Sequence, residues 1–197
     1  MKLALIGYGK MGQAIEEIAC ARGHEVVLRI NQASAASLDM NALQQADACI
    51  EFTSPDAVVS HLMLCFDAGK PVVCGTTGWL LNWDVIKTYC EEKQGTLLYA
   101  SNFSVGVQVF LRINQYAASL MKSVPGYELS MEEIHHTAKK DAPSGTAISL
   151  AEEILKAYPQ KTGWVSGESA DPAALQIRSR REDPAPGTHH VNYTSEV

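Results

Sequence analysis

The stretch KLALIGYGKMGQAIEEIACARG, residues 2–23, decides the fold of the N-terminal part of this chain. A short apolar run typical of a strand covered on both faces leads through a glycine-rich turn into an amphipathic helix. In the turn, Gly7, Gly9 and Gly12 form the pattern G-x-G-x-x-G. The first glycine permits a tight turn, the second lets a pyrophosphate approach the backbone, and the third lets the helix lie close to the strand. Because the N–H groups at a helix N-terminus favour an anion, we predict a dinucleotide site here.

Strand patterns alternate with helical patterns after this unit. Such repetition predicts a parallel sheet with helices on both faces and right-handed connections, so the fold class is α/β with an N-terminal Rossmann-type sheet. The expected strands lie at 24–30, 47–52, 71–77 and 96–101, and the expected helices at 38–46, 54–69 and 81–95.

Beyond residue 102 the pattern predicts a smaller α+β domain. The expected elements are a helix over 105–124, a strand with one exposed face over 127–136, a helix over 145–158, and strands over 174–181 and 189–197. The turn-rich segment EDPAPGT, residues 182–188, predicts that the last two strands form an antiparallel pair. We place the domain boundary near residues 103–110, which gives domains of residues 1–105 and 106–197.

Composition narrows the class of protein. A hydrophobic content of 46%, a charged content of 19% and a net charge of −6 are ordinary for a globular protein and argue against a nucleic-acid partner. The five cysteines are widely spaced, which favours buried or half-buried free thiols in a reducing compartment. The apolar run at the N-terminus is too short for a signal peptide or a membrane span. We therefore expect a cytoplasmic protein with no membrane partner.

Small polar residues follow three of the predicted strands. The segments EFTSP (51–55), CGTTG (74–78) and ASNFSVG (100–106) each lie where open α/β sheets bind ligands. The carboxylate that would hold a ribose 2′-hydroxyl after the second strand is absent, because Asn31 and Gln32 stand there. Arg29 either assists a 2′-phosphate or is a strand residue facing solvent. NADPH is therefore permitted by the sequence but not established by it.

The stretch EEIHHTAKKDAPSGTA, residues 132–147, carries a second candidate site. His135 and His136 are adjacent, so on a strand they point to opposite faces. Asp141 or Ser144 caps the helix that begins nearby. A helix N-terminus beside lysine and histidine is a good receptor for a carboxylate, and histidine exchanges protons near neutral pH.

A zinc site is the alternative use of these side chains. The candidate ligands are His135, His136, Asp141, His189 and His190. Their spacing matches neither H-E-x-x-H nor a Cys/His finger, and no cysteine is near. We predict that the chain binds no metal.

The segments GYGKMG, EFTSP, CGTTG and SNFSVGV, and above all E-I-HH-T-A-K-K-DAPSGTA, occur in this order along nearly the whole chain. Together they resemble the dihydrodipicolinate reductase family, also called 4-hydroxy-tetrahydrodipicolinate reductases, of the bacterial and plant lysine pathway. The resemblance implies NADPH- or NADH-dependent reduction of a cyclic unsaturated dicarboxylate to tetrahydrodipicolinate, in lysine and diaminopimelate biosynthesis. It also implies a homotetramer in which the sheets of substrate-binding and oligomerisation domains pack together.

Site residues follow from the same resemblance, position by position. His135 and Lys139 are the implied proton donors, and the implied substrate-binding residues are His136, Lys139, Gly145 and Thr146. The implied cofactor-binding residues are Gly7, Tyr8, Gly9, Lys10, Met11, Gly12, Asn31, Gly75, Thr76, Thr77, Ala100, Ser101, Asn102 and Phe103.

Two features depart from the family pattern. An acid or a basic pair usually follows the second strand, where this chain has Asn31, so cofactor preference stays open between NADH and NADPH. The family also continues beyond VNYTSEV, residues 191–197, with more sheet and a helix returning to the nucleotide domain. We therefore expect either a shortened member or a fragment.

Two other functions fit part of the sequence. A related dehydrogenase acting on an aspartate-like or semialdehyde substrate would share the glycine turn but would not need HHTAKKDAPSGT. A non-catalytic nucleotide sensor would keep Gly7, Gly9 and Gly12 but has no use for His135 together with Lys139. This chain has the glycine turn together with His135 and Lys139, and their joint presence favours the reductase.

Overall fold

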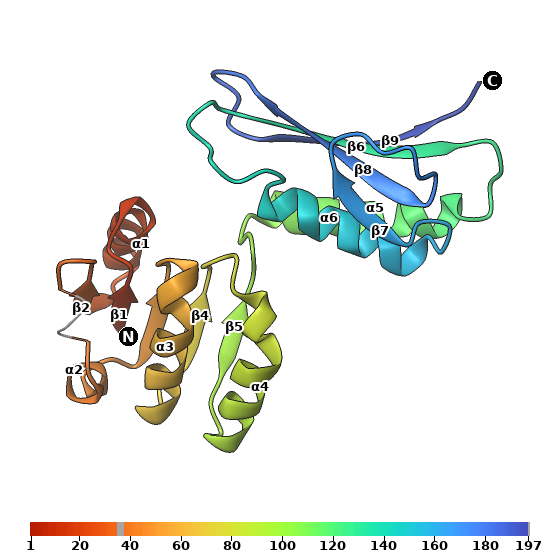
Figure 1. Cartoon of the computed structure of the whole chain (residues 1–197). Helices are drawn as coiled ribbons and strands as arrows, with labels where there is room; N and C mark the ends of the chain where they lie inside the picture. The colour runs from red at the N-terminus through yellow and green to blue at the C-terminus, as the bar shows by residue number, and fades with distance from the viewer. Residues whose placement is uncertain (35–37, 197) are drawn as a thin grey trace. The chain divides into compact units, whose positions relative to one another are not determined.

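The computed structural model describes residues 1–34 and 38–196 of the chain. The chain forms two compact units, Met1–Ser101 and Asn102–Val197, which we describe separately (Figure 1). None of the helices among the described residues combines the length and the apolar character needed to cross a bilayer.

The first unit contains a five-stranded parallel sheet in the order β2-β1-β3-β4-β5. This arrangement confirms the predicted Rossmann-type fold. The strands are β1 (Lys2–Ile6), β2 (Glu25–Ile30), β3 (Ala48–Glu51), β4 (Val72–Cys74) and β5 (Leu97–Tyr99). The helices are α1 (Lys10–Ala21), α2 (Met40–Gln44), α3 (Pro55–Asp67) and α4 (Trp83–Glu92), with a 3₁₀ turn, η2 (Leu80–Asn82), before α4.

Both faces of this sheet are covered, as the continuous apolar strands require. Successive side chains of β1 point to opposite faces. Leu3 and Leu5 pack in a cluster with Ala19 of α1. Ala4 and Ile6 pack on the other face, in a cluster with residues from α2, α3 and α4. Because all five strands are parallel, their carboxyl ends meet at one edge of the sheet.

The second unit contains a four-stranded mixed sheet in the order β7-β8-β6-β9. Its strands are β6 (Glu128–His135), β7 (Gly163–Ser166), β8 (Ala174–Arg181) and β9 (Thr188–Thr194). Two helices, α5 (Val105–Met121) and α6 (Gly145–Ala157), pack on one face of the sheet (Figure 1). The predicted elements are present, and β7 is an additional strand that we did not predict. Val197, the last residue of the final expected strand, lies outside the described residues.

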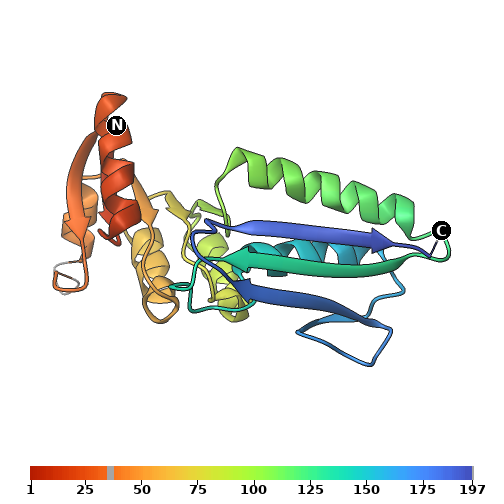
Figure 2. The same cartoon turned by 90° about the horizontal axis from the view of Figure 1, so that it is seen from above.

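The prediction that the last two strands pair with each other is wrong. Figure 2 shows β6 between them: it pairs with β8 in parallel and with β9 in antiparallel orientation. The connection between β8 and β9 is long enough to cross one strand, since neighbouring strands are about 4.8 Å apart. Leu129 and Met131 on β6 are almost fully buried, which fits a strand with a neighbour on each side.

The opposite face of the second sheet is mainly polar and carries no helix among the described residues. It presents Ser130, Glu132, Arg178, Arg180, His190 and Asn192, all half-buried or exposed.

The cysteines follow their prediction with one correction. Cys49, Cys65 and Cys74 are buried and Cys90 is half-buried, but Cys20 is exposed, and all five are free. Cys20 lies on the solvent side of α1, where its sequence neighbours on that face are polar.

Candidate functional site

The glycine turn of the first unit is shaped by close backbone contacts. Gly7 has φ +100°, and a Cβ there would lie 1.9 Å from the carbonyl oxygen of Phe52. A Cβ at Gly12 would lie 2.6 Å from the Gly7 carbonyl oxygen, so this residue lets α1 pass close to the turn. Gly9 differs, because nothing lies within 4 Å of the Cβ it lacks. It precedes the first residue of α1, so open space adjoins the helix N-terminus. A pyrophosphate fits this arrangement.

A pocket of about 470 Å³ adjoins the glycine turn. Asn31 lies in its wall, and its side-chain oxygen accepts the Ser34 N–H at 2.9 Å. Among the described residues, the lining of this pocket includes the neutral Asn31 amide and neither a carboxylate nor a guanidinium. The lining residues are Gly7, Tyr8, Gly9, Ile30, Asn31, Gln32, Phe52, Thr53, Ser54, Ala57 and His61.

Arg29 is paired inside the first unit. Its Nε donates to Glu16 Oε1 at 2.9 Å, and the Tyr8 hydroxyl donates to the same carboxylate. Hydrogen bonds from Arg29 and Tyr8 lower the pKa of Glu16 to about 2. Arg29 does not line the pocket beside the glycine turn, so the structure favours its interpretation as an exposed strand residue.

The remaining predicted cofactor residues of the first unit lie at the carboxyl ends of β4 and β5 and on the first turn of α1. Gly75 packs against the Phe52 ring, to which a Cβ would come within 2.1 Å. Thr76 is buried and Thr77 is exposed. Ala100 and Ser101 follow β5, and Lys10 and Met11 are exposed at the start of α1. Asn102 and Phe103 begin the second unit, where Asn102 Nδ2 lies 3.4 Å from Thr146 Oγ1.

Within the segment EFTSP, the sequence pattern did not single out Glu51, a fully buried carboxylate at the end of β3. It accepts hydrogen bonds from Thr76 Oγ1 at 2.7 Å and Cys74 Sγ at 3.3 Å, and from the Thr53 hydroxyl. Burial alone would raise its pKa, but hydrogen bonds from His61, Thr53, Thr76 and Cys74 outweigh it and leave the pKa below its usual range. An acid at the end of an apolar strand is the signal that could have revealed it.

Cys74 is not a nucleophile in this setting. Burial and the neighbouring Glu51 raise the pKa of its thiol to about 12, so the thiolate is scarce at neutral pH.

The end of β6 forms the second candidate site. His135 is the last residue of this strand and is buried, while His136 follows it and is exposed. The two adjacent histidines therefore have different environments, as strand alternation predicted. Glu133, two positions before His135 and on the same face, has no exposed surface.

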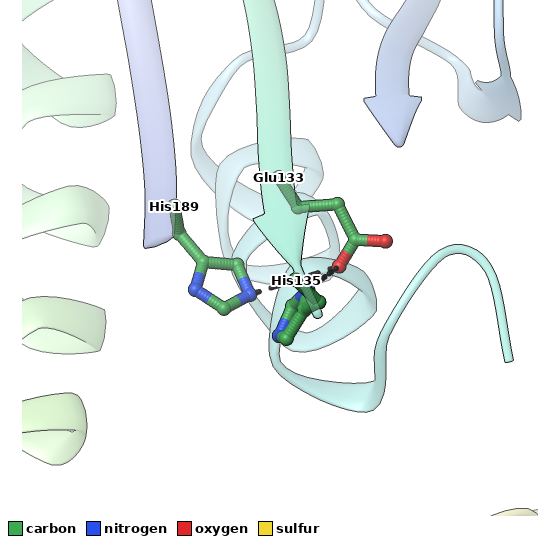
Figure 3. Close-up of side chains that lie close together, drawn as sticks. All are labelled: Glu133, His135 and His189. Atoms are coloured by element: carbon green, nitrogen blue, oxygen red, sulfur yellow. Dashed lines mark ion pairs between the residues drawn. The ribbon is translucent and has the colours of Figure 1, made fainter. Parts of the chain in front are cut away.

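Glu133, His135 and His189 form a cluster between β6 and β9 (Figure 3). Glu133 Oε2 lies 3.3 Å from His135 Nδ1 and 3.8 Å from His189 Nε2. The two imidazole rings meet edge to face, with centroids 5.1 Å apart. Arg181 of β8 approaches from the other side, where its NH2 lies 3.4 Å from Glu133 Oε1.

The charges of this cluster are set by opposing effects. Burial would raise the pKa of Glu133, but hydrogen bonds from Ser144 and the charge of His135 outweigh it, so this pKa lies below its usual range. Burial lowers the pKa of His135, Glu133 opposes that effect, and Lys139 and Arg181 add to it. The site therefore holds an ionised carboxylate next to a histidine that readily gives up its proton.

The same three side chains could geometrically surround a metal ion, because their ligand atoms lie within 4.8 Å of one another. A divalent cation there would face the Arg181 guanidinium, which already neutralises Glu133. We interpret the cluster as a hydrogen-bonding and charge-paired group. The sequence-based prediction of no metal stays a prediction.

The loop after β6 leads into the N-terminus of α6. Ser144 caps this helix, since its Oγ accepts the Ala147 N–H at 3.2 Å, and Gly145 and Thr146 form the first turn. Lys139 Nζ donates to Asp141 at 2.8 and 2.9 Å, so Asp141 holds the lysine and Ser144 is the cap. An ammonium group and a helix N-terminus thus lie in one loop-and-helix segment, both suited to an anion.

Glu133 and Arg181 are the residues of this site that sequence reasoning missed, and His189 was considered only as a metal ligand. Counting back by two from His135 would have placed Glu133 on the same face. His189 and Arg181 come from β9 and β8, and only the strand register brings them to the end of β6.

Comparison with known proteins gives consistent matches. Residues 1–103 match the family described as "Dihydrodipicolinate reductase, N-terminus", and residues 106–197 match "Dihydrodipicolinate reductase, C-terminus". The 4-hydroxy-tetrahydrodipicolinate reductase of Christiangramia forsetii is 42% identical over 197 residues, which cover 100% of this chain and 81% of that protein. The protein of the same name from Bdellovibrio bacteriovorus is 36% identical over 181 residues, covering 90% and 72%.

A solved structure shares the fold. The dipicolinate-bound dihydrodipicolinate reductase from Paenisporosarcina sp. TG-14 aligns with a TM-score of 0.73 at 23% identity. The alignment covers 100% of this chain and 84% of that one.

Proposed function

The chain belongs to the dihydrodipicolinate reductase family, and from this premise we propose how its residues perform the reaction. It is an NADH- or NADPH-dependent oxidoreductase with the activity of a 4-hydroxy-tetrahydrodipicolinate reductase, in lysine and diaminopimelate biosynthesis. In this proposal the first unit, Met1–Ser101, binds the dinucleotide and the second unit, Asn102–Val197, binds the dicarboxylate substrate.

One observation carries the proposal for the second unit. His135, a buried histidine beside an ionised carboxylate, ends a strand next to a loop and helix start that offer Lys139 and free backbone N–H groups. Reduced nicotinamide supplies a hydride when it is bound. The electron density that the hydride brings to the substrate must then be protonated, and His135 is placed to give that proton.

Lys139 has a second role in this proposal. Its ammonium group stabilises the developing negative charge and binds a substrate carboxylate, and Asp141 holds it in place until the substrate arrives. The substrate-binding residues are His136, Lys139, Gly145 and Thr146. The last two present the N–H groups of the first turn of α6, which attract an anion.

The proposed cofactor residues lie at the carboxyl edge of the first sheet and in the segment that follows it. Support comes from the open space at Gly9 and from the neutral pocket wall at Asn31, which accepts a ribose with or without a 2′-phosphate. These residues are Gly7, Tyr8, Gly9, Lys10, Met11, Gly12, Asn31, Gly75, Thr76, Thr77, Ala100, Ser101, Asn102 and Phe103.

The function is tested by following the oxidation of NADH and of NADPH with enzymatically generated 4-hydroxy-tetrahydrodipicolinate. Turnover with at least one nucleotide, and tetrahydrodipicolinate as the product, is the expected result. Absence of turnover with both would refute the assignment.

We further propose a cytoplasmic homotetramer. Among the described residues no helix covers the outer sheet face of the second unit, where Glu132 contacts both Arg180 and His190, and this face is available to a second copy. The free cysteines fit a reducing compartment. Light scattering in solution should give the mass of four chains, and a monomer at micromolar concentration would contradict the tetramer.

A further inference from the structure

Glu133 is a charged group that the proposed proton transfer leaves without a role. It lies on the core face of β6 and has no exposed surface, although burying a carboxylate is costly unless its charge is compensated. Leu129 and Met131, earlier on the same face, are apolar residues of the core. An apolar side chain at position 133 would continue that pattern, so packing of the core does not explain the carboxylate, and the neighbouring histidine offers a role for it.

The surroundings of the carboxylate hold it in one orientation. Oε1 faces the Arg181 guanidinium at 3.4 Å, and Oε2 accepts the Ser144 backbone N–H at 3.0 Å. The remaining side of Oε2 faces the rings of His135 and His189 (Figure 3). Because both oxygens are anchored by groups outside the imidazole pair, Glu133 can fix a ring without moving toward it.

The two nitrogens of His135 have different environments. Nδ1 is buried, has no hydrogen-bond partner among the described residues and lies 3.3 Å from Glu133 Oε2. Nε2 lies beside Gly187, where an added Cβ would come within 3.1 Å. Hydrogen bonds of catalytic groups are often long without a substrate and shorten when it binds. Nδ1 is thus the nitrogen that the protein holds, and Nε2 is the nitrogen left for a ligand.

We propose that Glu133 is a positioning residue of the reduction. Its carboxylate keeps a proton on His135 Nδ1, directs Nε2 to the substrate and stabilises the imidazolium that donates the proton. His189, edge to face with the same ring, restricts its rotation. This inference rests on the proposed role of His135 as proton donor.

The proton balance of this step is simple. The Nε2–H bond of the imidazolium breaks, and its proton passes to the substrate atom that carries electron density after hydride transfer. A bound reduced nicotinamide would supply the hydride that reduces the substrate. The imidazole is left neutral with its proton on Nδ1, and water restores the second proton.

Charges face His135 from several elements, and their balance gives the expected effect of a substitution. Glu133 and Asp141 favour the charged ring, whereas Lys139 and Arg181 disfavour it. His189 of β9 is a further titratable neighbour, and its Nε2 lies 3.8 Å from Glu133 Oε2. Removing the carboxylate at position 133 therefore leaves mainly cations around the ring, so His135 should lose its proton at lower pH.

The first test needs no substitution at Glu133. Nitrogen-15 NMR of the imidazoles in the wild-type protein, assigned by comparison with His135→Gln, reports which nitrogen of neutral His135 carries the proton. We expect the Nδ1–H form, because the carboxylate faces that nitrogen. A neutral ring protonated mainly on Nε2 would overturn the inference.

The second test compares Glu133→Gln with Glu153→Gln. Both substitutions remove one negative charge from the second unit, but Glu153 lies on α6 and pairs with Lys156. Glu133→Gln should lower kcat by about tenfold to a hundredfold, leave the substrate KM within about twofold and move the alkaline limb of the kcat profile to lower pH. Glu153→Gln should behave as wild type. An unmoved limb in Glu133→Gln would overturn the inference.

The two tests separate this inference from the proposed function. A wild-type protein without reductase activity but with Nδ1–H on His135 would refute the function and leave the positioning of the ring intact. An active wild-type protein with the proton on Nε2 would do the opposite.

Discussion

Glu133 Oε2 lies 3.3 Å from His135 Nδ1, and both side chains are on the face of β6 that carries the hydrophobic core of the second unit. The face is apolar at Leu129 and Met131 and becomes charged toward the end of the strand. A titratable pair in this position is partly removed from water, so each partner has a strong effect on the charge of the other. This relationship underlies the predictions for the second unit.

The rate of reduction should fall as pH rises through the titration of His135. Burial lowers the pKa of this histidine and Glu133 only partly offsets that effect, so the pKa lies below its ordinary value of about 6.5. A proton donor must be protonated, hence kcat should be highest below this pKa and fall above it. Steady-state kcat at saturating substrate across the pH range measures this. A kcat that stays constant through the histidine range would contradict His135 as the donor.

Gly187→Ala should impair the reaction through His135. The added methyl group would come within 3.1 Å of His135 Nε2, and the backbone φ of +147° is unfavourable for alanine. We expect kcat to fall by roughly tenfold to a hundredfold because the ring is displaced. Gly126→Ala is the control, since its φ of +82° is also positive but no described atom beyond its chain neighbours lies within 4 Å of the new atom. Equal effects of the two substitutions would attribute the loss to backbone strain alone.

Gly9→Val should abolish dinucleotide binding without unfolding the first unit. Apart from its chain neighbours, no atom of the described residues lies within 4 Å of the missing Cβ, so the side chain fits until a pyrophosphate needs the same space. The Kd for NADH should rise by roughly 100-fold in a fluorescence titration. Ala14→Val places the same side chain at an exposed position of α1 and should bind normally. Normal dinucleotide binding by Gly9→Val would show that the pyrophosphate does not bind at this turn.

Asn31→Asp should shift cofactor preference toward NADH. A carboxylate in this pocket wall accepts a hydrogen bond from the ribose 2′-hydroxyl and repels a 2′-phosphate. The ratio of kcat/KM for NADH to that for NADPH should rise about tenfold or more. Asn192→Asp adds the same charge to the outer face of the second sheet and should leave the ratio unchanged. An unchanged ratio in Asn31→Asp would exclude Asn31 from the ribose site.

Glu51→Gln should destabilise the first unit at pH values where the Glu51 carboxylate is ionised. Burial opposes ionisation of Glu51, but its hydrogen bonds outweigh burial and depress the folded-state pKa. Its stabilisation is therefore fully present above the unfolded value of about 4.3 and is lost as pH falls through the folded-state pKa. Near neutral pH, urea unfolding should show a loss of about 1–3 kcal/mol, and this difference from wild type should shrink in acid. Glu25→Gln, at an exposed position, is the control; a difference that does not shrink would contradict this role of Glu51.

Local sequence patterns predicted much of this molecule because their physical causes are local. The spacing of Gly7, Gly9 and Gly12 requires no knowledge of distant residues, and the structure shows close backbone contacts at the first and third of them. The alternation along β6 likewise separated His135 from His136. Pairing between distant strands has no such local cause. The position of β6 between β8 and β9, and with it the contacts of His189 and Arg181, depends on register that no local pattern contains.

The most direct test of this account is the steady-state kcat of His135→Gln with enzymatically generated 4-hydroxy-tetrahydrodipicolinate, beside the Kd of the same variant for the nucleotide. His135 lies in the second unit and the glycine turn lies in the first, so the substitution should lower kcat by about 100-fold or more and leave the Kd unchanged. A variant that turns over at the wild-type rate would contradict the assignment of His135 as the proton donor.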